Sequence, residues 1–128
     1  VEIQSTVLWQ IEFGSQCRVE ITSPWRIISE GAISLTNLDH RARWGDSEPI
    51  DGVEETTKIL VNARVKVVGY TTVGDLIIDF EGPHILQVLN LSSLYEAWNL
   101  YGFEECHYIG LGGGNVATFL PSPTQHKK

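Results

Sequence analysis

Two stretches of sequence decide the fold: WQIEFGSQCRVEI at residues 9–21 and LIIDFEGPHILQV at residues 76–88. In each stretch large apolar residues recur at every second position, which is the pattern of a strand with one buried face. A glycine-containing turn divides each stretch in the middle, so each one predicts a β-hairpin. The side chains that we expect in the core are Trp9, Ile11, Phe13, Val19, Ile21, Leu76, Ile78, Phe80, Leu86 and Val88.

The two hairpins align with each other when the chain is shifted by 67 residues, so that Phe13 meets Phe80. A duplication that relates residues 7–25 to residues 74–92 would produce this match. Chance would also produce it, because hairpins commonly resemble one another. We therefore expect two related β-meanders and leave their origin open.

These patterns predict a mainly β fold, α+β at most, with two β-meanders that form a small barrel or a two-layer sandwich. One short helix is expected over residues 53–62, with Asp51 as its N-cap. Residues 1–120 form a single domain in this prediction, and residues 121–128 form a frayed polar tail. Shorter strands are expected around Ile27 to Leu35, after Arg64 and in the last hairpin.

A long loop is predicted between Thr36 and Gly52, where turn-forming residues are concentrated. Leu38, Trp44 and Ile50 are its only large apolar residues, so we expect them to anchor it to the core. Long loops in compact domains are often functional, which makes this loop a candidate site.

Composition narrows the class of partner. The chain has 128 residues, is 42% hydrophobic and carries a net charge of −7. That length supports one core. The excess of carboxylates argues against nucleic acid and against an anionic membrane surface as partners, because both attract basic proteins. The sequence has no apolar run that could span a bilayer and no secretory signal pattern, so a cytoplasmic location is expected.

The sequence predicts no catalytic centre, metal site or cofactor. Its histidines lack the spacing of metal-binding motifs, and His40 with Asp39, Asp46 and Glu48 is the only local cluster of metal-ligand types. The glycines after Ile109 are followed by a strand pattern, which favours a hairpin over a phosphate-binding loop. Cys17 and Cys106 are far apart in sequence, and whether they pair is left open.

An acidic stretch is the first candidate for partner binding. It contains no Lys or Arg from position 44 to position 57, and its carboxylates are Asp46, Glu48, Asp51, Glu54 and Glu55. A concentrated negative patch of this kind steers a basic partner toward it. A loop whose charges only keep the protein soluble would have the same composition.

The second candidate is the segment NLSSLYEAW at residues 90–98. Tyr95, Glu96 and Trp98 combine large aromatic area with polar groups, which suits a recognition surface and suits a core equally well. In the structural alternative, Ser92 or Ser93 caps a helical turn and Glu96 completes a capping box.

Several segments resemble a family of small uncharacterised bacterial proteins. The resemblance rests on SPWR at residues 23–26, on the strand motif GDLIIDF at residues 74–80, and on VLNLSSLYEAW at residues 88–98. It covers most of the chain, from Val7 to Phe119, and implies no catalytic residue. In size and acidity such proteins are similar to the immunity proteins of bacterial toxin systems.

Three functions remain open at this point. The first is a non-catalytic binding protein, of the immunity type, that inhibits a basic toxin domain. The second is a structural or dimerising interaction domain, for which a homodimer is one form. The third is a small-ligand-binding barrel or an enzyme.

Overall fold

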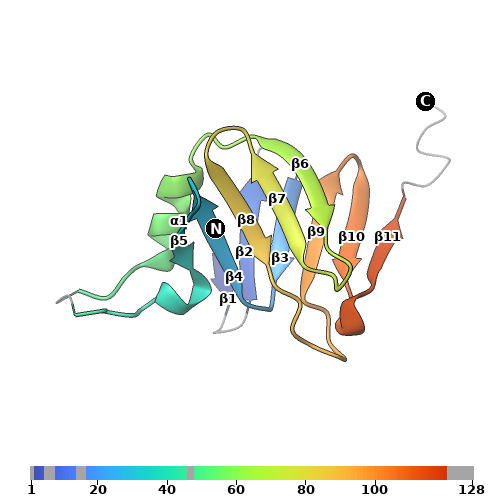
Figure 1. Ribbon diagram of the computed structural model, residues 1–128, viewed down its shortest axis with the longest axis horizontal. Helices are drawn as coiled ribbons and strands as arrows, with labels where there is room; N and C mark the ends of the chain where they lie inside the picture. The colour runs from blue at the N-terminus through green and yellow to red at the C-terminus, as the bar shows by residue number, and fades with distance from the viewer. Residues whose placement is uncertain (1, 5–7, 14–16, 46–47, 121–128) are drawn as a thin grey trace.

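The computed structural model describes residues 2–4, 8–13, 17–45 and 48–120, and all strands in it pair antiparallel. The strands form two separate sheets that pack face to face (Figure 1). No strand pairing joins one sheet to the other within the described residues, so the sheets do not close into a barrel. The predicted mainly β fold is confirmed, and of its two forms the structure is the two-layer sandwich.

The larger sheet has six strands in the order β1-β2-β3-β9-β10-β11. Its strands are β1 (Glu2–Gln4), β2 (Leu8–Phe13), β3 (Cys17–Ile21), β9 (Trp98–Phe103), β10 (Cys106–Gly110) and β11 (Val116–Phe119). The smaller sheet has five strands in the order β5-β4-β8-β7-β6. Its strands are β4 (Trp25–Ser29), β5 (Ala32–Thr36), β6 (Val65–Tyr70), β7 (Leu76–Phe80) and β8 (His84–Val88).

The core lies between the inner faces of the two sheets. All the side chains that the period-two pattern predicted to be buried are buried there. Phe13 on β2 and Phe80 on β7 meet across the layers, with ring centroids 5.2 Å apart. On β2, β3, β7 and β8, buried positions alternate with more exposed ones, which explains why the hydrophobic pattern located the core so well.

The two predicted hairpins have the same register. In β2–β3, Trp9 pairs with Ile21, and in β7–β8, Leu76 pairs with Val88. Both pairs are related by the shift of 67 residues that aligns the sequences. A duplication requires this agreement but is not its only explanation, so duplication stays a prediction.

After each of these hairpins the chain crosses to the other sheet. β3 continues into β4 of the smaller sheet, and β8 continues into β9 of the larger one. The two crossings are joined by equivalent hydrogen bonds: Thr22 N donates to Ala97 O over 3.0 Å, and Leu89 N donates to Pro24 O over 2.9 Å. Each sheet therefore takes one hairpin from each half of the chain.

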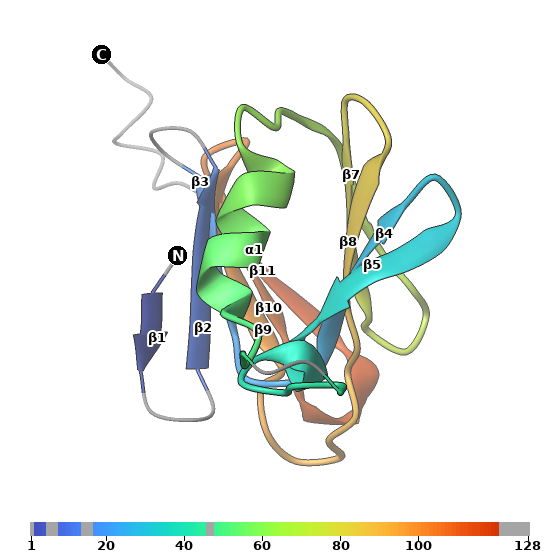
Figure 2. The same cartoon turned by 90° about the vertical axis from the view of Figure 1, so that its left-hand side faces the viewer.

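The single described α-helix, α1 (Gly52–Leu60), covers one end of the sandwich (Figure 2). The prediction for residues 53–62 is confirmed, although the helix begins one residue earlier and ends sooner. Asp51 is the N-cap, as predicted: its Oδ1 accepts hydrogen bonds from Val53 N and Glu54 N, each over 3.1 Å. At the opposite end, β10 and β11 extend beyond β6 and lie away from α1 (Figure 1).

The loop between β5 and α1 is anchored differently from our expectation. It begins with a short 3-10 helix, Asn37–Asp39. Ile50 packs against the core, as predicted. Leu38 and Trp44 do not, because their side chains are 73% and 69% exposed. The prediction that they anchor the loop was wrong. Backbone hydrogen bonds hold it instead, from Arg41 N to Ile50 O over 2.7 Å and from Ile50 N to Ala42 O over 2.8 Å.

The segment between β8 and β9 is a bent loop and not a helical turn. Ser92 Oγ accepts hydrogen bonds from Leu94 N and Tyr95 N, as a cap would, but no helix follows. The Glu96 carboxylate accepts from Asn99 Nδ2 over 3.2 Å, so no capping box forms. The last hairpin is confirmed, with its turn at a short 3-10 helix, Gly112–Gly114.

Candidate functional site

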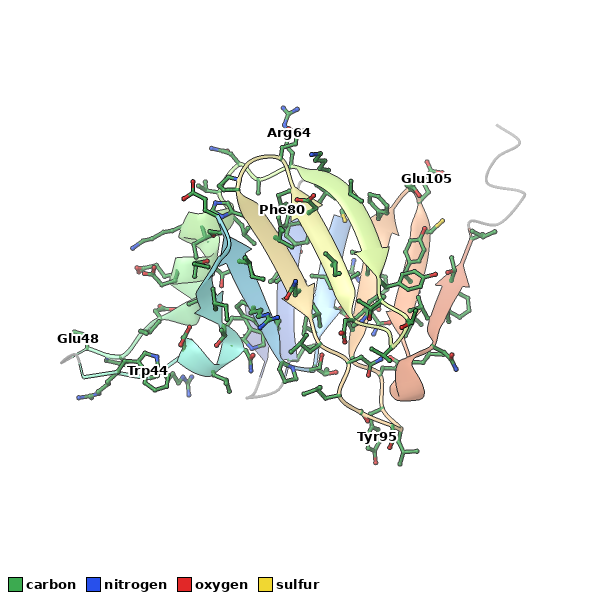
Figure 3. All side chains as sticks on the ribbon, in the orientation of Figure 1. Trp44, Glu48, Arg64, Phe80, Tyr95 and Glu105 are labelled. Atoms are coloured by element: carbon green, nitrogen blue, oxygen red, sulfur yellow. The ribbon has the colours of Figure 1, made fainter. Side chains whose placement is uncertain are left out.

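A hollow beside α1 gathers most of the acidic stretch, and we call it the acidic hollow. Its volume is about 570 Å³. The residues that line it come from β5, the following loop and the first turns of α1: Ser34, Leu35, Asp39, Trp44, Glu48, Pro49, Ile50, Asp51, Glu54 and Glu55. Figure 3 shows Trp44 and Glu48 on the loop that projects from this end of the molecule.

Asp39 holds the exposed indole of Trp44 at the hollow. One carboxylate oxygen, Oδ2, accepts from Thr36 N over 2.9 Å, which fixes the carboxylate at the start of the 3-10 helix. The other oxygen, Oδ1, accepts from Trp44 Nε1 over 3.0 Å. One edge of the indole is thus tied to a fixed group while most of its surface faces solvent.

The charge of the hollow is unevenly compensated. Lys58 lies 3.6 Å from Glu54 and 3.5 Å from Glu55, and these two carboxylates raise the pKa of its ammonium group. Within the described residues no ion pair involves Glu48 or Asp51. Glu48 and Asp51, which line the hollow together with Trp44, therefore keep negative charges that no neighbouring ion pair compensates in the described part of the chain.

The structure brings together four of the carboxylates that the sequence singled out: Glu48, Asp51, Glu54 and Glu55. Asp46 lies outside the described residues. Sequence reasoning missed Asp39 and Trp44 as members of the site. Trp44 was assigned to the interior on hydrophobicity alone. An available signal was its place among turn-forming residues, where a large side chain has little core to reach.

The second candidate segment divides into an exposed part and a buried part. Tyr95 is 75% exposed, and Glu96 is also exposed (Figure 3). Trp98 is only 1% exposed, and its Nε1 donates to Gly74 O over 2.9 Å. The placement of Trp98 on a partner surface was therefore wrong, because its indole fills the core and its one donor is satisfied there.

The exposed loop between β8 and β9 is held by hydrogen bonds at its base. Gly113 N donates to Ser92 O over 2.8 Å, and Asn90 Nδ2 donates to Leu111 O over 2.9 Å. Tyr95 thus projects from a fixed loop. This loop lies away from the acidic hollow, so the two candidates are separate surfaces (Figure 3).

The remaining candidates have structural roles. His40 Nδ1 accepts from Gly52 N over 2.9 Å, and its ring packs edge-on against Trp9. Cys17 and Cys106 are both free thiols, so they do not pair. Across the described ranges, no group of three or more His, Cys, Asp or Glu side chains is arranged to hold a metal ion.

Comparison with known proteins identifies a family. A family model described as "Family of unknown function (DUF6188)" matches residues 1–120. The chain belongs to this DUF6188 family. No curated protein matches it, and no solved structure matches it.

Membership of DUF6188 confirms the expectation of an uncharacterised family, while the three sequence motifs that suggested a particular family stay a prediction. The family description assigns no activity. Within the described residues, every helix is too short or too polar to span a lipid bilayer.

Proposed function

We propose that this DUF6188 protein is a non-catalytic binding protein whose acidic hollow receives a basic segment of a partner protein. The observation that carries the proposal is the exposed Trp44 indole beside the carboxylates of Glu48 and Asp51, which form no ion pair with any described residue. A large exposed aromatic side chain costs hydration free energy in the free protein. Binding would recover that cost.

Arginine fits this combination of groups best. Its guanidinium stacks on an aromatic face and donates paired hydrogen bonds to a carboxylate. Tryptophan is the strongest aromatic partner for a cation. A lysine would take the same charge environment but lacks the planar stacking surface.

The finer form of the proposal is an immunity-type inhibitor of a basic toxin domain. Toxins that act on phosphate-containing substrates need basic clefts, and a projecting acidic loop blocks such a cleft without any chemistry. The net charge of −7 favours fast association with a basic target. The similarity in size and acidity to immunity proteins points the same way.

The test begins with affinity capture from the source cells, using matched charge variants. The hollow variant combines Glu48→Gln, Asp51→Asn and Glu54→Gln. Its control combines Glu30→Gln, Glu81→Gln and Glu105→Gln, which removes equal charge from exposed positions outside the hollow. We expect wild type and control to capture the same partner and the hollow variant to lose it.

Stopped-flow measurement of association with the captured partner then separates two effects. Electrostatic steering changes the association rate, and direct contact changes the equilibrium affinity. We expect the hollow variant to associate about tenfold more slowly than wild type at low salt, with the difference shrinking as salt is added. Trp44→Ala should weaken the equilibrium affinity by about tenfold or more, as a central aromatic anchor does.

Tyr95→Ala is the matched aromatic control, because Tyr95 is similarly exposed on the other candidate loop. It should leave affinity unchanged. If Tyr95→Ala abolishes capture while the hollow variant binds like its control, the proposal fails. The inhibitor form also requires the partner to be an enzyme that loses activity at one equivalent of this chain, and a partner that stays active would refute that form.

A further inference from the structure

The end of the sandwich away from α1 contains a second hollow, which we call the aromatic groove. Its volume is about 440 Å³. It lies between β6 at the edge of the smaller sheet and β9 and β10 of the larger one. Its lining residues are Lys66, Val67, Val68, Tyr70, Leu76, Trp98, Leu100, Phe103, Glu104 and Tyr108.

The floor of the groove is rigid and apolar. Leu76, Trp98 and Leu100 are fully buried core side chains that lie directly beneath the groove, so its accessible surface comes from the side chains around them. Trp98 is further fixed by its hydrogen bond to Gly74 O. A floor made of packed core side chains keeps its shape without a ligand, as small-molecule sites commonly do.

Aromatic walls and a few polar groups complete the groove. Tyr70, Phe103 and Tyr108 stand on three different strands around the floor. Burial raises the pKa of the Tyr108 hydroxyl, with smaller effects from Cys106, Glu104 and Tyr70. Tyr108 is therefore a neutral phenol at physiological pH, able to donate and to accept a hydrogen bond.

The charges at the rim cancel. Lys66 contributes one positive charge and Glu104 one negative charge, and neither belongs to an ion pair within the described residues. A ligand with a strong net charge gains little from such a rim. The apolar floor and the neutral phenols favour an uncharged ligand.

We propose that the aromatic groove binds an uncharged small molecule that contains an aromatic ring and one hydroxyl group. Its volume lies within the range of about 300–1,000 Å³ that is typical of small-molecule sites. The ring packs between the aromatic walls over the Trp98 floor, and the hydroxyl group faces Tyr108. This site is independent of the acidic hollow and lies at the other end of the molecule.

A second copy of the chain or an added peptide strand fits this end less well than a small molecule does. Either would extend the smaller sheet by pairing with the free edge of β6. The register of β6 shifts between Val65 and Val67, so its hydrogen-bonding pattern is interrupted. Irregularities of this kind, together with an edge lysine such as Lys66, protect edge strands from further pairing.

The test uses 2-naphthol as the probe. Its binding is measured by two-dimensional NMR of the uniformly labelled chain. We expect saturable binding at one site, with shift changes concentrated at amides of β6, β9 and β10. Tyr108→Phe keeps the wall and removes the hydroxyl. It should weaken 2-naphthol binding severalfold and leave binding of 2-methylnaphthalene unchanged.

A substitution that blocks the groove provides the second test. Val67→Trp places a large side chain at its mouth and should weaken 2-naphthol binding at least tenfold. Ile33→Trp is the control, since Ile33 is similarly exposed on β5, the opposite edge of the same sheet. The Ile33→Trp variant should bind 2-naphthol as tightly as wild type does.

Three results would overturn the proposal. One is the absence of saturable binding up to the solubility limit of the probe. Another is equal weakening by Val67→Trp and Ile33→Trp. The third is a dimer in sedimentation experiments that Val67→Trp dissociates, because the groove would then be an interface between two copies.

Discussion

Trp44 and Trp98 show how position determines the role of one residue type. Trp98 has its indole in the core and its donor on a backbone carbonyl. Trp44 has its donor on an aspartate and most of its ring in water. Both residues follow polar, turn-forming sequence, so hydrophobicity did not distinguish them. The difference lies in whether the neighbouring backbone joins a sheet.

The pair of Phe13 and Phe80 provides a test of the core at residue scale. Replacing either with Ala should lower the free energy of unfolding by about 3–5 kcal/mol, because a buried aromatic ring is lost and a cavity remains. Phe119→Ala is the control, since Phe119 is more than half exposed, and it should change stability by less than about 0.5 kcal/mol. Urea unfolding measures all three. A loss below about 1 kcal/mol for Phe13 or Phe80 would contradict the packing described here.

Cys17 provides a second test, based on its titration. Partial burial raises the pKa of its thiol, which lowers the fraction of reactive thiolate at any pH below that value. In a Cys106→Ala background, iodoacetamide should therefore modify Cys17 more slowly at pH 8 in the folded protein than in urea. The rate should keep rising with pH beyond the point at which the unfolded thiol levels off. Equal rates in both states would show that Cys17 is freely exposed.

At the scale of elements, α1 joins the fold to the acidic hollow. Asp51 caps the helix and also lines the hollow. Thr56 is a buried residue of the same helix, and its hydroxyl donates to Gly52 O over 2.6 Å. The helix is short, so its ends contribute much of its stability. Asp51 thus caps the helix and also contributes charge to the hollow, and substitutions can separate these two functions.

Asp51→Ala should lower the free energy of unfolding by about 1 kcal/mol, because the amides of Val53 and Glu54 lose their acceptor. Asp51→Asn should cost less, since asparagine also caps helices well. Both substitutions remove the same charge. We therefore expect equal losses of partner association rate but unequal losses of stability, measured by urea unfolding. Equal destabilisation by both would contradict the capping role.

At the scale of the whole molecule, the exchange of hairpins makes the two halves interdependent. β3 pairs with β9 in one sheet, and β4 pairs with β8 in the other. Both pairings join residues from different halves of the chain. Each sheet contains strands from both halves, so we expect the two halves to fold as one unit.

Separate fragments test this interdependence. A cut after Asn62, in the connection that follows α1, gives fragments 1–62 and 63–128. We expect each fragment alone to give the narrow amide shift range of an unfolded chain in NMR spectra. An equimolar mixture should recover the dispersed β-sheet spectrum. A dispersed spectrum from either fragment alone would show an independently stable half.

The sequence by itself determined the local structure. Period-two alternation predicted both long hairpins, and every side chain that it placed in the core is buried. The reason is that a half-buried strand must alternate apolar and polar side chains. Asp51 and the glutamates after it identified the start of α1, because exposed amides at a helix start need acceptors close in sequence. The acidic stretch was also visible, since charge is a property of composition.

Only the tertiary structure decided which hairpin pairs with which. The β3–β9 and β4–β8 contacts join strands separated by long stretches of chain, and the hydrogen bonds between strands are made by backbone groups common to all residues. No local pattern encodes such a pairing. The same cause hid the roles of Trp44 and Trp98 and the existence of the aromatic groove. A hollow is defined by which walls face each other, and the walls of this one come from β6 and β7 of one sheet and β9 and β10 of the other, which meet only when the two sheets pack face to face.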